Sequence, residues 1–261
     1  MTQVQVATPA HSTGFEDRVV VVTGGAAGIG QAVVQLMVEL GAVVASVDMT
    51  AQGVPPGAAA LIADVTDQQA VDQAVQTFAE VHGRIDVLVN NAGVSFVGTI
   101  EDGSDGDWLR IMDINVLGQM RSTRAALPYL RKSKSAAIVN MSSCTAVNGL
   151  PQRALYSASK GAVQSMTRAM AADLIAENIR VNGVSPATVD TPFMAELAAR
   201  APDPAAKRRE FGLRQPTGRM VAPIEVARTV AYLAHPESFS CVGMIVDIDG
   251  GMGPLRMPVN H

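Results

Sequence analysis

The chain has few cysteines and few charged residues, and each shortage excludes a class of protein. Its 261 residues include two cysteines, Cys144 and Cys241, which form neither a CxxC pair nor part of a cluster of metal ligands. We therefore expect no metal site, and such cysteine usage suits a reducing compartment, so we expect a cytoplasmic protein. Lysine and arginine number 20, against 24 aspartates and glutamates. This balance lacks the basic patch that a nucleic-acid or anionic-membrane partner would require, so neither partner is expected.

Long hydrophobic runs are also missing. No apolar stretch approaches the ~20 residues of a membrane span, and the first residues lack the basic start and apolar stretch of a signal peptide. We expect residues 1–17, which are small and polar, to form a flexible tail. Apolar types nonetheless make up 48% of the chain and charged residues 17%, against roughly 25% charged in typical soluble domains. The chain must therefore bury surface in a large core or in subunit contacts.

Short apolar runs alternate with amphipathic helical windows. The run 18–22 is continuous and β-branched, as expected of a strand that is buried on both faces. Further strands are predicted at 42–47, 60–63, 85–90, 136–141, 180–185 and 243–248. Helices are predicted after the first strand and at 67–82, 108–130, 156–177 and 223–233. This alternation predicts one doubly wound α/β domain over residues 18–252, with a parallel sheet of about seven strands and helices on both faces. We expect broken helices to form a lid over 190–220, and residues 253–261 to form a C-terminal tail.

A glycine-rich loop follows the first predicted strand. Gly24, Gly28 and Gly30 form a Gly-x-x-x-Gly-x-Gly pattern just before a helical window. Glycine permits positive φ and close approach of the backbone to a pyrophosphate, and a helix start offers free N–H groups and the positive end of a dipole. The spacing differs from the GxGxxG fingerprint, and a tight turn without a ligand is the alternative. The position between a buried strand and a helix favours nucleotide binding.

An aspartate ends the second predicted strand. Asp48 lies 24 residues after Gly24, where a carboxylate can accept hydrogen bonds from both hydroxyls of an adenosine ribose and would repel a 2′-phosphate. No arginine stands in the glycine loop or just after Asp48 to receive such a phosphate. The expected cofactor is therefore NAD rather than NADP. The alternative is a solvated aspartate that caps a turn.

A tyrosine and a lysine open a long predicted helix. Tyr156 and Lys160 are four residues apart, so their side chains share one face. An ammonium beside a phenol stabilises the phenolate and lowers the pKa of the phenol from its ordinary ~10, which makes Tyr156 a usable general acid or base. Ser143 follows the fifth predicted strand, at the edge where α/β sheets bind ligands. Such Tyr–Lys pairs also arise by chance on helix surfaces, so the pair alone is weak support.

Taken together, these segments resemble the classical short-chain dehydrogenase/reductase family, from about Arg18 to Met252. The resemblance rests on Thr23-Gly24-x3-Gly28-Ile29-Gly30, Asp64-Val65, Asn90-Asn91-Ala92-Gly93, Asn115, Ser143, Tyr156-Ser157-Ala158-Ser159-Lys160 and Asp249-Gly250-Gly251. All occur in the family's order and spacing. The resemblance implies a Rossmann-type fold and an NAD-dependent oxidoreductase that transfers a hydride between a secondary alcohol or ketone and the nicotinamide.

The resemblance also implies roles for single residues. Tyr156 would exchange a proton with the substrate oxygen, which Ser143 would hold in place. Lys160 would bind the nicotinamide ribose and lower the pKa of Tyr156, and Asn115 would anchor a water of the proton relay. The implied cofactor contacts are Gly24, Gly28, Ile29, Gly30, Asp48, Asp64, Val65, Asn91, Ala92, Gly93, Tyr156, Lys160, Pro186, Val189 and Thr191. For Asn90 we expect a structural hydrogen bond at the strand end instead. Ala187 stands where the family usually has glycine, so the turn that precedes Val189 and Thr191 is expected to differ.

Two arginines bear on the substrate. Arg153 precedes Tyr156 by three residues, and Arg214 lies in the lid segment. The block 188–219 is similar to a subgroup of cytosolic (R)-3-hydroxybutyrate and 2-keto-3-deoxy sugar-acid dehydrogenases, which use arginines at positions matching these two. A further arginine of that subgroup is replaced by Leu197. A small hydroxy acid or sugar acid is therefore expected, its carboxylate forked by a guanidinium. The alternative for both arginines is a surface or subunit-interface role.

Other functions remain open from the residues alone. The main alternative substrate is a neutral sugar, polyol or cyclic diol, and a remoter alternative is a catalytically silent NAD-binding sensor. Because helices 108–130 and 156–177 are apolar and rich in small residues, we expect them to pack across twofold axes. A homotetramer with dihedral symmetry is therefore expected, as the family resemblance also implies.

Overall fold

A computed structural model describes residues 13–255 of the chain. Seven strands form one parallel sheet in the order β3-β2-β1-β4-β5-β6-β7. They are β1 (Val19–Thr23), β2 (Val43–Asp48), β3 (Ala59–Ile62), β4 (Val87–Asn90), β5 (Ala136–Met141), β6 (Ile179–Pro186) and β7 (Ile245–Ile248). Every predicted strand is present, with ends shifted by at most two residues. The predicted doubly wound α/β fold is confirmed.

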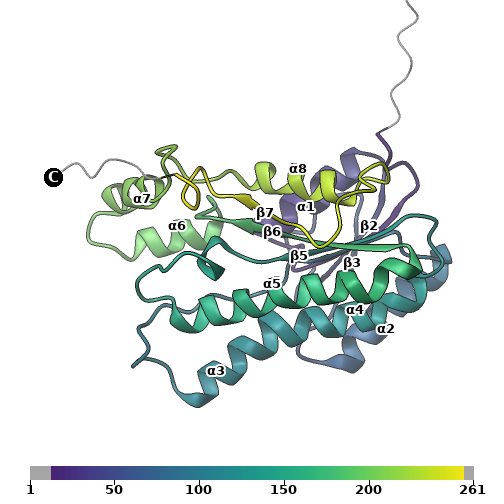
Figure 1. The fold of residues 1–261 in the computed structure, drawn as a ribbon, viewed down its shortest axis with the longest axis horizontal. Helices are drawn as coiled ribbons and strands as arrows, with labels where there is room; N and C mark the ends of the chain where they lie inside the picture. Colours follow the sequence, from purple (N-terminus) through teal and green to yellow (C-terminus); the bar gives the residue numbers. More distant parts are fainter. Residues whose placement is uncertain (1–12, 256–261) are drawn as a thin grey trace, which may run out of the picture.

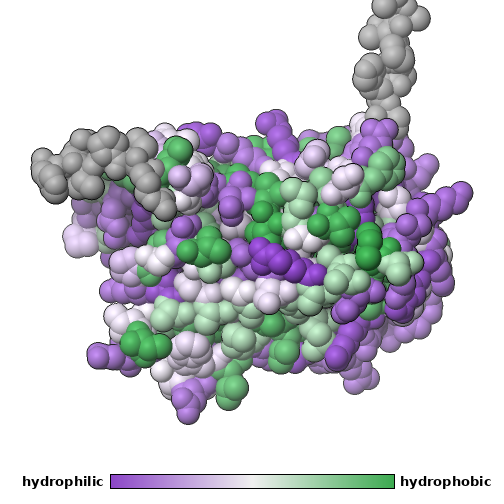
Figure 2. Space-filling model, in the orientation of Figure 1, coloured by the Kyte–Doolittle hydropathy of each residue, from purple (hydrophilic) through white to green (hydrophobic). Residues whose placement is uncertain are grey.

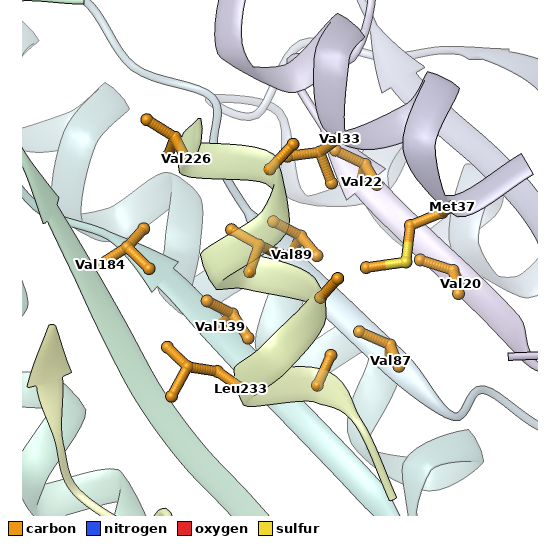
Figure 3. Packing of buried hydrophobic residues seen from close by; sticks show 14 of the residues in the cluster. Val20, Val22, Val33, Met37, Val87, Val89, Val139, Val184, Val226 and Leu233 are labelled. Atoms are coloured by element: carbon orange, nitrogen blue, oxygen red, sulfur yellow. The ribbon is translucent and has the colours of Figure 1, made fainter. Parts of the chain in front are cut away.

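Helices cover both faces of the sheet (Figure 1). On one face lie α1 (Gly28–Glu39) and α8 (Pro223–Ala234), and on the other α2 (Gln68–His82), α4 (Gly118–Leu130) and α5 (Ala154–Leu174). Strand β1 shows how the sequence produces these layers, because alternate side chains point to opposite faces. Val20 and Val22 pack against α1 and α8, as Figure 3 shows, whereas Val19 and Val21 belong to the core on the other face.

The long helix predicted at 108–130 is interrupted. The structure has α3 (Asp105–Met112), a π-helical turn over Asp113–Leu117 and then α4. Arg121 Nη2 lies 2.6 Å from Asp113 Oδ1 and ties the turn to the following helix. The hydrophobic pattern does not reveal such a turn, because one inserted residue barely shifts the helical period. The second long helix, predicted at 156–177, is observed as α5 followed by a 3₁₀ turn, Ile175–Glu177.

The N-terminal segment is anchored where a tail was expected. Residues 1–12 lie outside the described part, but Phe15 is 2% exposed and its ring meets the His235 ring at 5.6 Å between centroids. Thr13 Oγ1 donates to the Leu40 carbonyl, and Asp17 N donates to the Gly41 carbonyl. The prediction of a flexible tail is therefore wrong for residues 13–17, because one aromatic side chain is buried against α8.

The lid expected at 190–220 contains α6 (Pro192–Ala199) and α7 (Pro204–Leu213), which project beyond one end of the sheet (Figure 1). Arg208 on α7 donates to both carboxylate oxygens of Asp190 at the base of this segment. Of the expected C-terminal tail, Gly253 N donates to Asp249 Oδ2 at 2.7 Å, and residues 256–261 lie outside the described part. Between residues 13 and 255, no helix is both long and apolar enough to cross a membrane.

Candidate active site

Four strand ends lead directly into the expected site. Gly24 follows β1, Asn91 follows β4, Ser143 lies two residues after β5, and Ala187 follows β6. Because these strands are parallel neighbours, their carboxyl ends share one edge of the sheet, where α/β proteins bind ligands. The fold therefore brings together residues that are up to 163 positions apart in the chain (24 to 187).

The glycine loop is shaped for close contact with a ligand. Gly24 and Gly28 have φ of +66° and +57°, a conformation that favours glycine. A Cβ on Gly30 would lie 2.0 Å from the Gly24 carbonyl oxygen, so only glycine fits there. Helix α1 begins with no side chain capping its first N–H groups. Free N–H groups at a helix start suit a phosphate, and this loop can hold the pyrophosphate of a dinucleotide.

Asp48 is half-buried beside this loop. Its Oδ2 accepts a hydrogen bond from Ala26 N at 3.0 Å, so the carboxylate braces the glycine loop. Within residues 13–255 it forms no ion pair. The second oxygen thus remains available to ribose hydroxyls, and no arginine or lysine neutralises the carboxylate in favour of a 2′-phosphate.

Of the other expected adenine and cofactor-wall residues, Asn91 adjoins the loop, whereas Asp64 and Val65 follow the end of β3. Asp64 Oδ1 accepts from Thr66 N, and Val65 is buried against Gly118, where a Cβ would come within 2.9 Å of the valine side chain. Asn91 Nδ2 donates to the Gly24 carbonyl at 2.9 Å, which joins the wall after β4 to the glycine loop.

Asn90 has the structural role that was expected of it. Its Nδ2 donates to Thr123 Oγ1 at 3.0 Å and to Asn140 Oδ1 at 2.9 Å. These bonds cross-link β4, β5 and α4 beneath the site. Asn90 is fully buried, so it stabilises the floor of the site and does not face the ligand edge.

Ser143 and Tyr156 meet at the end of β5. The pKa of Tyr156 is raised above its ordinary 10, chiefly because burial disfavours the phenolate. A hydrogen bond with the Ser143 side chain and the positive charge of Arg153 act in the opposite direction. The sequence predicted a lowered pKa for this phenol, and that prediction is wrong for the chain in this geometry.

The position of Lys160 explains the difference. Its Nζ donates to the Met141 carbonyl at 2.9 Å and lies 5.8 Å from the centroid of the Tyr156 ring. The ammonium therefore faces a backbone oxygen rather than the phenol oxygen. Burial lowers the pKa of Lys160 from 10.5 to about 8. The two side chains share a helix face, as predicted, but their charges are not paired.

Asn115 lies in the π-helical turn and is fully buried. Its Oδ1 accepts from Val94 N at 2.8 Å, and its Nδ2 donates to the Val94 carbonyl at 2.9 Å and to Ser159 Oγ at 3.0 Å. Asn115 thus fixes the segment after Asn91, Ala92 and Gly93 to the start of α5. A Cβ on Gly93 would meet Asn115 Oδ1 at 3.0 Å and Lys160 Nζ at 3.4 Å, so the three residues are close neighbours.

The segment after β6 tolerates alanine without strain. Ala187 is not among the described residues with positive φ, and its N–H donates to the Ile248 carbonyl at 3.1 Å. The turn thus does not need the glycine that the family usually has after Pro186. Val189 is buried, and the Thr191 side chain lies opposite Gly28, where a Cβ would be 3.4 Å from Thr191 Cγ2. The start of the lid therefore faces the glycine loop.

Arg153 and Arg214 approach the same region. Burial lowers the pKa of Arg153, the charge of Arg214 lowers it further, and Tyr156 acts in the opposite direction. Arg153 Nη1 donates to the Phe96 carbonyl at 3.1 Å, and no carboxylate within residues 13–255 pairs with this guanidinium. Arg214 lies over the Phe211 ring and 3.4 Å from Glu210 Oε1.

The whole domain matches one protein family. A family model described as enoyl-(acyl carrier protein) reductase matches residues 24–253. The chain belongs to the classical short-chain dehydrogenase/reductase family. Among relatives, L-fucose dehydrogenase of Bos taurus is 40% identical, over 93% of this chain and 92% of that protein. Meso-2,3-butanediol dehydrogenase of Serratia marcescens is 37% identical, over 91% and 95%.

A solved structure of the family gives the same result in three dimensions. The ligand-free aldohexose dehydrogenase of Thermoplasma acidophilum superposes with a TM-score of 0.87 at 34% identity, covering 94% of this chain and 98% of that chain. As a short-chain dehydrogenase/reductase, the protein is an oxidoreductase that acts on CH–OH groups with a nicotinamide cofactor. Within residues 13–255 there is no cluster of three or more His, Cys, Asp or Glu side chains suited to a metal ion.

Proposed function

We propose that the protein is an NAD-dependent dehydrogenase of a secondary alcohol that carries a carboxylate, a small hydroxy acid or sugar acid. The observation that carries the substrate class is the half-buried Arg153 guanidinium, which has Arg214 and Tyr156 as charged or titratable neighbours and, among residues 13–255, no carboxylate partner. An anionic group between the two arginines would offset this uncompensated charge. The similarity of block 188–219 to the 3-hydroxybutyrate and sugar-acid subgroup supports the same class.

In this proposal each residue of the site has a separate role in the transfer of the hydride and the proton. The bound nicotinamide accepts or supplies the hydride. Ser143 donates a hydrogen bond to the substrate oxygen, and Tyr156 takes the hydroxyl proton during oxidation and returns it during reduction. Lys160 binds the nicotinamide ribose and stabilises the phenolate, and Asn115 holds the wall segment at Val94 while anchoring a water of the proton relay. Because burial raises the pKa of Tyr156, this stabilisation by Lys160 depends on its leaving Met141.

NAD is the proposed cofactor, on the strength of Asp48. NADP would lose a hydrogen bond between its ribose and the Asp48 carboxylate, and its 2′-phosphate would be repelled by that carboxylate. At ~1.5–3 kcal/mol per charged hydrogen bond, the binding free energies of the two cofactors should differ by a few kcal/mol. Asp48→Ala should lower the ratio of kcat/KM for NAD to kcat/KM for NADP, mainly by changing the KM of each cofactor. Equal use of NAD and NADP by the wild type would contradict the role assigned to Asp48.

A neutral sugar, polyol or diol is the second candidate substrate. It is favoured by the names of the relatives, which act on L-fucose, meso-2,3-butanediol and aldohexoses. Arg153 would then be structural, since its guanidinium already fastens the Phe96 carbonyl and residues Gly98 and Arg153 form a β-bridge. The two candidates predict different effects of removing the Arg153 charge on the kcat/KM for acidic and for neutral substrates.

The test is NADH formation from a panel of 3-hydroxybutyrate, sugar acids, free sugars and diols by wild type, Arg153→Met and Arg200→Met. A charge-assisted pair in a water-poor pocket contributes about 2–4 kcal/mol, so Arg153→Met should lower kcat/KM for acids by roughly 30- to 800-fold. Neutral alcohols should be nearly unaffected, and Arg214→Met should act in the same way but more weakly. Arg200, an exposed arginine at the end of α6, provides the matched control. Equal losses on acids and neutral alcohols in Arg153→Met would favour the neutral-substrate candidate.

We further propose a homotetramer in the cytoplasm, with no nucleic-acid or membrane partner. Helices α4 and α5 lie side by side on one face of the sheet (Figure 1), and a mostly white and pale green band runs along this region in Figure 2. Small half-buried residues such as Gly161, Ala162 and Ala125 allow close approach of another helix.

A further inference from the structure

A buried glutamine shares the oxygen that holds Lys160. Gln119 lies on α4, one turn after Asn115, and is 2% exposed. Its Nε2 donates to the Met141 carbonyl at 3.2 Å, and Lys160 Nζ donates to the same oxygen at 2.9 Å. A carbonyl oxygen has two lone pairs and can accept both bonds. Met141 ends β5 and is 4% exposed, so no bulk water reaches this oxygen easily.

The assignment of the amide follows from chemistry. If the Gln119 amide were turned over, its carbonyl oxygen would face the Met141 oxygen at hydrogen-bond distance, and two acceptors repel each other. The amide therefore donates to Met141. The Oε1 of the Gln119 amide is buried and has no hydrogen-bond partner within residues 13–255. In this part of the chain, the amide is therefore held by its bond to the Met141 carbonyl.

Lys160 has to leave this oxygen to do what the proposed function asks of it. In the present geometry the ammonium points to Met141 and lies 5.8 Å from the Tyr156 ring centroid. It is also next to Gly93 in the expected cofactor wall, so a rotated side chain would face the cofactor site. Moving the ammonium would leave a buried carbonyl without a donor, which is unfavourable unless another donor stays in place.

We propose that Gln119 is a positioning residue for Lys160. By keeping its hydrogen bond to the Met141 carbonyl, it allows the ammonium to turn to the nicotinamide ribose without stranding that oxygen. This inference rests on the proposed function, in which Lys160 binds the ribose. Gln119 itself does not touch the reacting atoms.

The test is a double-mutant cycle between Gln119→Met and Lys160→Met, read out as the Kd of NADH by fluorescence titration. Gln119→Met removes the donor and keeps the side-chain length, so it should weaken NADH binding about 5- to 30-fold. In the Lys160→Met background the same change should have no further effect, because no ammonium has to leave Met141. Gln119→Glu should also weaken binding, since an ionised carboxylate cannot donate to Met141 and attracts the Lys160 ammonium.

Ser122→Ala is the control, because Ser122 is a buried polar residue one turn further along α4 that bonds to the Gly118 carbonyl and not to Met141. It should leave the Kd of NADH unchanged. Equal losses from Gln119→Met with and without Lys160, or wild-type binding by Gln119→Met or Gln119→Glu, would overturn the inference alone. If Lys160→Met by itself left NADH binding unchanged, the role of Lys160 in the proposed function would fail, and the inference with it.

Discussion

At the scale of single residues, burial sets the protonation of the site more strongly than the pairing of charges. The sequence places Tyr156 and Lys160 on one helix face, and that spacing predicts a lowered pKa of the Tyr156 phenol. The structure buries Lys160, half-buries Tyr156 and turns the ammonium to the Met141 carbonyl, so the pKa of Tyr156 is raised and that of Lys160 is lowered. Spacing along a helix predicts proximity, but it cannot predict which acceptor an ammonium chooses.

The shifted pKa of Lys160 has a consequence for stability. Its pKa falls from 10.5 to about 8, so between these values the folded chain holds a neutral amine while the unfolded chain holds an ammonium. The unfolded state binds more protons in this window, so wild-type stability rises with pH there relative to a variant without the amine. Below pH 8 the buried ammonium destabilises the fold.

We therefore predict that the stability advantage of Lys160→Met over wild type is largest near pH 7. It should shrink by roughly 2–4 kcal/mol as the pH approaches 10.5, at 1.36 kcal/mol per pKa unit. Urea unfolding at a series of pH values and one protein concentration measures this difference. A difference that stayed constant over pH 7–10 would show that the pKa of Lys160 is not lowered in the fold.

At the scale of elements, the five inner strands were predictable because each is buried on both faces, whereas the edge strands β3 and β7 are partly exposed. A parallel strand between two helical layers has to be an uninterrupted β-branched run, and Val19 to Val22 satisfy this in the sequence itself. The glycine loop was predictable for a different reason. Glycine is favoured where φ is positive or where another backbone comes close. The π-helical turn around Asn115 could not be predicted, because the one glycine that follows it, Gly118, is equally compatible with a continuous α-helix.

The anchored segment 13–17 was missed because a single aromatic among small polar residues is a weak signal. Gln119 was missed for a related reason: a glutamine inside a helical window looks like a surface residue until its burial is known. In both cases tertiary packing, rather than local pattern, decides the outcome.

The role of Phe15 can be tested through stability. Because its ring is 2% exposed, Phe15→Ala should destabilise the fold by about 3–5 kcal/mol, the usual range for a buried phenylalanine. Phe239→Ala is the matched control, since that phenylalanine is 72% exposed and should change stability little. Thermal unfolding of both variants distinguishes an anchored segment from a free tail, and equal midpoints would contradict the packing described here.

At the scale of the whole molecule, a low fraction of charged residues is accommodated by two buried core layers and, as we propose, by subunit contacts. Charged residues make up 17% of the chain, and large apolar side chains such as Leu109 and Ile175 remain exposed on the single chain. Single exposed apolar residues are common in proteins, so the assembly has to be measured.

We predict that light scattering coupled to size-exclusion chromatography gives a mass near four times 27.2 kDa at micromolar concentration. Charged substitutions on the outer face of α5, such as Ala162→Glu, should shift the population to smaller species, because a charge buried in a helix–helix contact is strongly unfavourable. A stable monomer in the wild type would reject the tetramer without affecting the fold or the chemistry.

The central claim is that Tyr156 transfers the proton in an alcohol oxidation that depends on NAD. It is tested most directly by comparing wild type with Tyr156→Phe, in which only the phenolic oxygen is lost, for NADH formation from the best substrate of the panel and for NADH binding. We predict that turnover falls by at least about 100-fold, the lower range for general acid–base catalysis, while the Kd of NADH stays within about twofold. Turnover by Tyr156→Phe at a rate near that of the wild type would contradict this account.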